Sequence, residues 1–429
     1  MTITTYPTQE EWSQLLARPM LENDDLLGIV RPILQQVRER GDEALHEFEA
    51  RFDHCDLHQF QVTDDEFSIA ENEVEEALKE AIQLAAKQIR AFHVAQKMKP
   101  QVVESCRGVR CWQEPRPIEK VGLYIPGGRA PLFSTVLMLA LPAQIAGCGE
   151  VLLCTPPNVE GKINPAILYA AKLAGVTRVF KVGGAQAIAA MAYGTESISK
   201  VYKIFGPGNQ FVTAAKQLVS LRDCAIDMPA GPSEVQVLAD ETANPVFVAA
   251  DLLSQCEHGP DSQAILITTC EELVEKVRIE IAAQLAVLPR RDIASQSLLH
   301  SRIILVKDIK EAIAMTNRYA PEHLIIQMAN YQELVPLVSN AGSVFLGAYS
   351  CESAGDYASG TNHTLPTNGY AKAYSGVNLD SFIRKVTFQE LTAEGIQQIG
   401  PAIETMAAAE QLDGHKNAVT VRLKEIKTK

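Results

Sequence analysis

The sequence predicts an α/β fold with two parallel-sheet units that meet near Ser233. Between residues 118 and 346, short apolar runs, several ending in glycine, alternate with longer amphipathic runs, as strands and covering helices do. The chain of 429 residues is too long for one compact core. Its 47% hydrophobic and 21% charged residues are typical of a globular protein.

The strands and helices follow from these runs in chain order. In the first unit we expect strands at 121–125, 150–154, 178–182, 200–205 and 225–228, and helices at 133–147, 164–173, 185–193 and 209–221. In the second unit we expect strands at 235–238, 264–267, 302–306, 323–327 and 343–346, and helices at 244–256, 272–288, 309–317 and 331–340.

Both ends of the chain have helical periodicity. Segments 26–40 and 73–95 place apolar side chains at helical spacing, with charged residues on the opposite face. The chain turns helical again after about residue 381, with periodic segments at 391–409 and 416–426. A helical tail after a finished α/β core either packs on that core or wraps a partner subunit.

Charge and composition exclude several classes of protein. The net charge of −13 repels a phosphate backbone, so we expect no nucleic-acid partner. The first residues lack the pattern of a signal peptide, and Pro131 and Pro142 interrupt the one long uncharged run, 130–149. We therefore expect a cytoplasmic protein with no membrane partner. The nine cysteines are odd in number and form no CxxC, which argues against disulfides and a cysteine-built zinc site.

Glycine stands where several expected strands lead into helices, at 125–128, 182–186 and 205–209. Glycine permits positive φ, and the next helix presents free N–H groups to an anion at the carboxyl edge of the sheet. These glycines can equally be plain turn residues. The dinucleotide fingerprint G-x-G-x-x-G is absent, because Phe211 stands at its third glycine. The residues alone therefore do not establish NAD binding.

Two histidines stand beside residues that could share their chemistry. Gln255 and His258 are three apart at the predicted end of a helix, which suits either zinc ligands or a helix cap. Glu322 and His323 begin an expected strand, where successive side chains point to opposite faces. They are either general bases serving different places or a solvated pair at a strand entrance.

Two further histidines lie near the C-terminus. Asp356 and His363 belong to a segment rich in Gly, Ser and Asn that predicts a loop, which offers either metal and polar contacts or a solvated surface. Glu410 and His415 are five apart and would need a helix break at Gly414 to act together, the alternative being an exposed helix junction. A zinc site with mixed nitrogen and oxygen ligands draws single residues from such distant segments.

Several segments together resemble the histidinol dehydrogenase family. They occur in order over roughly residues 20–425 and include VGLYIPGGRAPLFSTVLMLALPAQIAGC, IFGPGN, DLLSQCEHGPDSQ, PEHLI, ESAGDYASGTNHTLPT and AAAEQLDGHKNAV. The resemblance implies two incomplete Rossmann-like domains, an intertwined homodimer and one Zn²⁺ per subunit. It also implies oxidation of L-histidinol to L-histidine through L-histidinal, with two NAD.

The same resemblance implies roles for individual residues. The zinc ligands would be Gln255, His258, Asp356 and His415, with His415 supplied by the partner subunit. His323 would be the general base in both oxidations, and Glu322 would activate the water that attacks the aldehyde. Together with the zinc ligands and His323, the residues holding the substrate would be Ser233, His363 and Glu410. Those contacting NAD would be Tyr124, Gln186 and Asn209.

The expected division of the chain has four parts. Residues 22–123 and 235–377 would form a Rossmann-like domain with most of the zinc site, and 124–234 a second one with the NAD contacts. Residues 1–21 and 378–390 would form a small domain, and 391–429 a helical dimerisation tail.

Other activities remain open on this scaffold. The chain could oxidise another small polar alcohol with NAD, or cleave an amide as a zinc hydrolase through Glu322 and a metal-bound water, which would leave the glycine turns idle. A non-catalytic binding protein is disfavoured because none of the catalytic residues is missing. Cys256 stands between two of the implied ligands, where the family commonly has alanine, so we also expect some sensitivity to oxidation.

Overall fold

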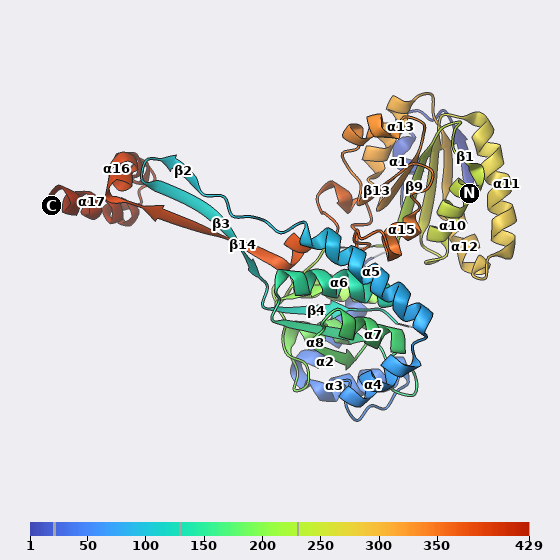
Figure 1. The fold of residues 1–429 in the computed structure, drawn as a ribbon, viewed down its shortest axis with the longest axis horizontal. Coiled ribbons are helices and arrows are strands. Elements are labelled where there is room, and N and C mark those ends of the chain that lie inside the picture. Colours follow the sequence, from blue (N-terminus) through green and yellow to red (C-terminus); the bar gives the residue numbers. More distant parts are fainter. Residues whose placement is uncertain (20–22, 128–129, 230, 429) are drawn as a thin grey trace. The chain divides into compact units, whose positions relative to one another are not determined.

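The computed structural model of the chain describes residues 1–19, 23–127, 130–229 and 231–428, and its fold is α/β (Figure 1). The chain forms two compact units from non-contiguous segments. The first consists of Met1–Gln96 and Ile118–Phe382, and the second of Lys97–Pro117 and Ile383–Lys429. The first unit contains the parallel sheets and covering helices that the sequence pattern predicts.

One sheet of the first unit is parallel throughout, with the strand order β6-β5-β4-β7-β8. Its strands are β4 (Lys120–Tyr124), β5 (Glu150–Thr155), β6 (Arg178–Lys181), β7 (Lys203–Phe205) and β8 (Ala225–Ile226). The connecting helices are α6 (Phe133–Ala146), α7 (Pro165–Leu173), α8 (Gly184–Tyr193) and α9 (Gln210–Ser220). The alternation of apolar and amphipathic runs predicts each of these elements to within a few residues.

The other sheet of the first unit has the parallel order β1-β11-β10-β9-β12-β13. Its strands are β1 (Thr2–Thr5), β9 (Glu234–Ala239), β10 (Gln263–Thr268), β11 (Arg302–Leu305), β12 (His323–Gln327) and β13 (Ser343–Leu346). The connecting elements are α10 (Pro245–Cys256), α11 (Glu271–Val287), α12 (Arg291–His300), α13 (Ile309–Tyr319), α14 (Tyr331–Leu334) and η2 (Val335–Leu337). Strand β1 is not predicted by the sequence pattern, since its TITT sequence contains no apolar run.

Helices before β4 cover the five-stranded sheet. They are α2 (Asn23–Arg40), α3 (Asp42–Phe48), the π-helical turn η1 (Glu49–Asp53), α4 (Asp64–Glu73) and α5 (Glu76–Val94). The short α1 (Trp12–Leu15) precedes them in the chain and packs in a core of the six-stranded sheet. Helix α2 packs on α8 and α9, α4 on α7, and α5 on α6. This packing differs from the expected grouping of 22–123 with 235–377. Helical periodicity shows which face of a helix is buried, but not which sheet covers it.

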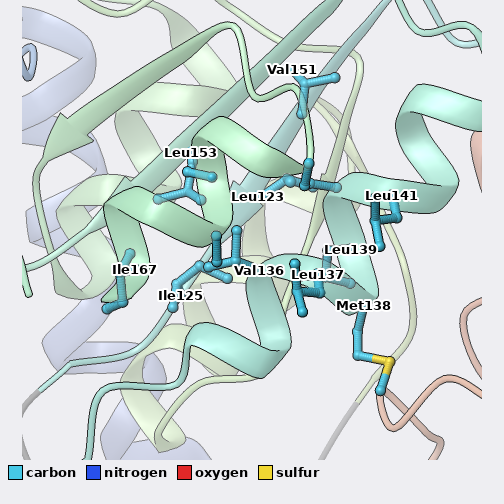
Figure 2. Packing of buried hydrophobic residues seen from close by; sticks show 14 of the residues in the cluster. Leu123, Ile125, Val136, Leu137, Met138, Leu139, Leu141, Val151, Leu153 and Ile167 are labelled. Carbon is cyan, nitrogen blue, oxygen red and sulfur yellow. The ribbon is translucent and has the colours of Figure 1, made fainter. Parts of the chain in front are cut away.

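One of the two core clusters of the five-stranded sheet lies between its strands and α6, and the other includes residues of α2, α8 and α9. Figure 2 shows Leu123 of β4, Val151 of β5 and Leu139 of α6 in one apolar cluster. Helix α6 is apolar around nearly its whole circumference because α5 packs on it as well. None of the helices in the described part of the chain has both the length and the apolar composition needed to span a membrane.

The second unit is an antiparallel sheet followed by two helices (Figure 1). Its strands β2 (Val103–Cys106), β3 (Val109–Pro117) and β14 (Ile383–Leu391) are ordered β14-β3-β2. Helices α16 (Ala393–Ala409) and α17 (Asp413–Thr428) then pack on each other. Both predicted helical segments lie in these helices, but the prediction of helix from residue 381 is wrong for β14. That strand alternates polar and apolar residues without a long apolar run.

In the sequence between β13 and β14, the chain forms only short helices. These are α15 (Glu352–Tyr357), η3 (Tyr370–Lys372) and η4 (Leu379–Phe382). The segment 352–363, predicted as a loop, therefore begins with a short helix, α15. The carboxylates of this segment are held by helical backbone.

A buried carboxyl group lies in α10, beneath the end of β12. Gln327 donates from Nε2 to Oδ2 of Asp251 at 2.7 Å, and Oε1 of Gln327 has no hydrogen-bond partner among the described residues. Burial raises the pKa of Asp251 to about 7, although the bond from Gln327 works in the opposite direction. The folded protein therefore keeps this proton at pH values where the unfolded chain has lost it, and stability falls as the pH rises between about 4 and 7.

Asp251→Asn should weaken this pH dependence. The amide has no charge to bury, and its Nδ2 can donate to the unpartnered Oε1 of Gln327. We expect the substitution to raise the free energy of unfolding, and the increase at pH 8 should exceed that at pH 5 by roughly 1–3 kcal/mol. Urea unfolding at both pH values measures this free energy. Asp292→Asn, which changes an exposed aspartate, is the control. An equal gain at both pH values would contradict the prediction.

Candidate functional site

Polar side chains gather at the amino ends of strands in the six-stranded sheet. Glu234, His323 and Ser343 are the first residues of β9, β12 and β13. The strand order reverses at β9, with β10 and β11 on one side and β12 and β13 on the other. Ligands of open α/β sheets usually bind at the carboxyl edge of such a switch point, so this cluster occupies the opposite edge.

The ring of His323 is held in one orientation inside the protein. Its side chain is 4% exposed, and Nδ1 lies 3.1 Å from the backbone oxygen of Glu234. Because a carbonyl oxygen only accepts, Nδ1 carries the proton and Nε2 presents its lone pair. That Nε2 has no hydrogen-bond partner among the described residues. Burial lowers the pKa of His323 to about 3, so the ring is neutral at neutral pH.

Glu322 lies beside this histidine rather than on the opposite face. Its Oε2 accepts a hydrogen bond from the backbone N–H of Glu234 at 2.8 Å and lies 3.6 Å from Nδ1 of His323. The expected alternation fails because β12 begins only at His323, so Glu322 is not part of the pleated strand. Burial raises the pKa of Glu322, and the charges of Glu234 and Asp356 raise it further.

Two carboxylates of α15 complete the cluster. Oδ1 of Asp356 is 3.8 Å from Nε2 of His323, and Oε1 of Glu352 is 3.9 Å from its Nδ1. One donor atom from each of these three residues lies within 4.8 Å of the others, a spacing at which they could hold a metal ion. Glu352 is not among the residues predicted from the sequence. The i, i+4 spacing of the two acids, which puts both on one helix face, was the available signal.

Gln255 and His258 approach the cluster from the C-terminal end of α10. The helix ends at Cys256, as Gly259 and Pro260 predict, and the side chain of Gln255 is fully buried. With its amide oriented to satisfy its neighbours, Gln255 donates from Nε2 to Glu352 and accepts from the backbone N–H of Glu234 at 3.1 Å. His258, one turn later, is exposed. His258 is thus open to solvent in the single chain, and the predicted zinc ligation by both residues stays a prediction.

His363 and Ser233 lie on the border of this cluster. Nδ1 of His363 donates to the backbone oxygen of Asp356 at 2.9 Å, and its Nε2 lies 3.1 Å from Oγ1 of Thr135. Burial lowers the pKa of His363 to about 4, so this ring is also neutral. Ser233 is half-buried next to β9, and its backbone oxygen accepts from Gln263 at 3.2 Å.

Glu410 and His415 belong to the second unit. Glu410 caps the C-terminal end of α16, His415 lies in the first turn of α17, and both are exposed. The break between the helices falls at Gln411, with φ of 59°, rather than at Gly414. Their predicted part in a shared zinc and substrate site stays a prediction.

The first NAD contacts predicted, Tyr124 and Gln186, are buried and already have partners. Oη of Tyr124 accepts from the N–H of Gly184 at 3.0 Å. Gln186 Nε2 and Gly183 N–H both donate to Oε1 of Glu49, at 3.0 and 3.3 Å. Burial and the nearby charge of Asp53 raise the pKa of Glu49. The N-terminus of α8, where an anion was expected, is therefore occupied by a carboxyl group of the chain itself.

Asn209 has a comparable local role at α9. It is the N-cap, and its Oδ1 accepts from Phe211 and Val212 at 3.0 and 3.1 Å. Unlike the other two, it is exposed. In the remaining glycine turn, Gly128 lies outside the described residues. Glycine is required at Gly206, where an added Cβ would meet the backbone oxygen of Tyr124 at 2.1 Å.

Cys256 is buried, and burial raises the pKa of its thiol. Because the thiolate is the form that reacts with oxidants, both properties work against the expected sensitivity to oxidation.

Comparison with known proteins was made for the whole chain. Residues 16–423 match the family model described as histidinol dehydrogenase. A protein of Bacteroides fragilis (strain YCH46) named histidinol dehydrogenase is 65% identical over 427 residues, covering 100% of both chains. Its namesake from Escherichia coli (strain K12) is 54% identical, covering 98% of this chain and 96% of the relative. A crystal structure of histidinol dehydrogenase from Elizabethkingia anophelis superposes with a TM-score of 0.98 at 55% identity, covering 100% and 99% of the two chains.

Proposed function

The chain belongs to the histidinol dehydrogenase family, and we propose that it oxidises L-histidinol to L-histidine through L-histidinal, using two NAD. The observation that carries this proposal is the buried neutral His323, whose free Nε2 faces Asp356 among acidic residues. An alcohol oxidation needs a base at the hydroxyl group, and a neutral imidazole of fixed tautomer supplies one.

His323 is proposed to take the hydroxyl proton at Nε2 in both oxidations. The hydrogen bond from Nδ1 to the backbone oxygen of Glu234 keeps that nitrogen protonated and stabilises the imidazolium that forms. Because the ring is enclosed, its orientation is set before substrate arrives, which reduces the cost of reaching the reactive geometry.

Glu322 is proposed to activate the water that attacks the aldehyde. A carboxyl group whose pKa is raised by burial is, once ionised, a stronger base than an exposed one. It lies 3.6 Å from the ring of His323, so both groups can serve one bound substrate in successive steps. Ser233, His363 and Glu410 are proposed to hold that substrate.

Zinc is proposed to bind Gln255, His258, Asp356 and His415 of the partner subunit. The mixed nitrogen and oxygen donors suit this ion, and the acidic group around Asp356 favours a cation. Zinc, when bound, would supply a fixed point that holds the substrate's nitrogen atoms. The buried carboxyl group of Glu352 would orient the amide of Gln255. The exposed ring of His258 would supply a nitrogen donor from the same chain.

NAD is proposed to bind at the carboxyl edge of the five-stranded sheet, where the strand order reverses between β4 and β7. Asn209 is the exposed member of the three predicted contacts, and Tyr124 and Gln186 make their hydrogen bonds at the start of α8. NAD, when bound, would accept the hydride.

We further propose a cytoplasmic, intertwined homodimer without nucleic-acid or membrane partners. The C-terminal helices α16 and α17 would form its dimerisation tail. The exposure of His415 in the single chain is compatible with a ligand that serves a second copy.

Two NADH should appear for each L-histidinol consumed. Absorbance measures NADH, and chromatography measures residual substrate and L-histidine. A chelator should abolish the reaction, and added zinc should restore it. One NADH per substrate would instead indicate a simple alcohol dehydrogenase. No NADH from folded, zinc-loaded protein would contradict the proposed activity and favour another substrate or the hydrolase reading.

Glu322→Gln should slow the second oxidation more than the first. The amide keeps the shape of the side chain but cannot take a proton from water, so turnover of added L-histidinal should fall by about 100-fold or more. Oxidation of L-histidinol should fall less, and an aldehyde trap should then detect L-histidinal. Glu333→Gln, at an exposed glutamate, is the matched control. Equal losses in both steps would rule out a separate role for Glu322 in hydration.

Mixing two inactive variants should restore activity if His415 acts across subunits. A heterodimer of His415→Ala and His323→Asn chains would contain one site with both histidines intact. Random subunit exchange should then recover roughly a quarter of the wild-type rate, because half of the dimers carry one intact site. If His415 served its own chain, each site would keep one defect and the mixture would stay inactive.

A further inference from the structure

A buried ion pair joins the N-terminal segment to the amino edge of the six-stranded sheet. Arg18 donates from Nε to Oε1 of Glu234 at 2.5 Å and from Nη2 to Oε2 at 2.8 Å, and the two side chains are 14% and 3% exposed. Nη2 also donates to the backbone oxygen of Tyr319 at 2.7 Å, and the guanidinium lies 4.0 Å from the centre of the Tyr319 ring. This two-pronged geometry fixes the carboxylate in direction as well as position.

The backbone of Glu234 is the element that holds both proposed catalytic residues. Its N–H donates to Glu322 at 2.8 Å, and its C=O accepts from Nδ1 of His323 at 3.1 Å. The same N–H faces the amide oxygen of Gln255 at 3.1 Å. A movement of this one residue therefore changes the positions or hydrogen bonds of all three side chains.

Further contacts surround the ion pair. The N–H of Asn368 donates to Oε1 of Glu234 at 2.6 Å. Gln263 donates from Nε2 to the backbone oxygen of Ala17 at 3.0 Å, and its Oε1 accepts from the hydroxyl of Tyr319 at 2.8 Å. The segment that carries Arg18 is thus anchored next to the ion pair by an independent hydrogen bond.

We propose that Arg18 and the Glu234 side chain are positioning residues for the acid–base pair. This inference rests on the proposed roles of Glu322 and His323. Without the guanidinium, the N–H of Asn368 would be the one hydrogen-bond partner left to the buried Glu234 carboxylate among the described residues, and the carboxylate would turn away. This movement shifts the backbone that fixes the tautomer of His323 and the direction of its free Nε2. Among the described residues, the hydrogen bonds of Arg18 go to Glu234, Tyr319 and Ala320 and not to the proposed zinc donors His258 and Asp356. Because the third donor from this chain, Gln255, shares the N–H of Glu234, the zinc content of each variant is measured beside its kcat.

The test compares Arg18→Met and Arg18→Lys with Arg318→Met in the zinc-loaded enzyme. Arg318 is an exposed arginine that also anchors the N-terminal segment, by donating to Oγ of Ser13 at 2.6 Å, but does not contact Glu234. We expect Arg18→Met to lower kcat by about 10-fold to 100-fold, with the KM for L-histidinol changed by less than about three-fold. Arg18→Lys, which keeps the charge but not the fork, should recover part of the loss and keep the protein folded. Arg318→Met should retain the wild-type kcat.

A double variant separates positioning from general destabilisation. If Arg18 acts through His323, then Arg18→Met should lower activity no further when His323→Asn is already present. A kcat that is unchanged in Arg18→Met and Arg18→Lys would overturn the inference, as would a loss that multiplies with His323→Asn or that follows loss of zinc. Wild-type activity of His323→Asn by itself would instead overturn the proposed catalytic role, whatever the Arg18 variants do.

Discussion

The two hydrogen bonds made by the backbone of Glu234 are the constraint on which the site depends. One bond holds the carboxyl group of Glu322, and the other decides which nitrogen of His323 carries the proton. Glu234 begins the strand at which the order of the sheet reverses. It pairs with Gln263 of β10, and the next residue, Val235, pairs with His323 of β12. The proposed acid–base pair is thus held by backbone that the sheet itself fixes.

Charge is concentrated in this site without matching cations from the same elements. Glu322, Glu352 and Asp356 are brought near His323, and burial raises the pKa of each carboxyl group. Such a group is costly in an empty site and becomes favourable when a cation or an ammonium group is present. Binding of a cation would offset part of this cost, so the acidic cluster suits the zinc proposed for it.

Much of the first unit could be predicted from periodicity, because buried parallel strands leave uninterrupted apolar runs such as Val121–Tyr124. What the sequence could not show was spatial. Nothing in the helical pattern of α2 or α5 reveals which sheet it covers, and β14 lacks an apolar run. Gln255, His323 and Asp356 could be singled out as residues of a known family, whereas Glu352, Arg18 and Glu234 act through contacts between distant segments that no local motif encodes.

The carboxyl group of Glu49 at the start of α8 has a kinetic consequence. In many nucleotide-binding folds such a helix end grips the pyrophosphate and prolongs the stay of the cofactor. Here the N–H of Gly183, the N-cap of α8, already donates to Glu49, and the N–H of Gly184 donates to Tyr124, so neither is free to bind a pyrophosphate. Under the proposed function one substrate is oxidised twice, and the first spent dinucleotide must depart before the aldehyde does. Weaker anchoring of the cofactor at this helix end would favour that order of release.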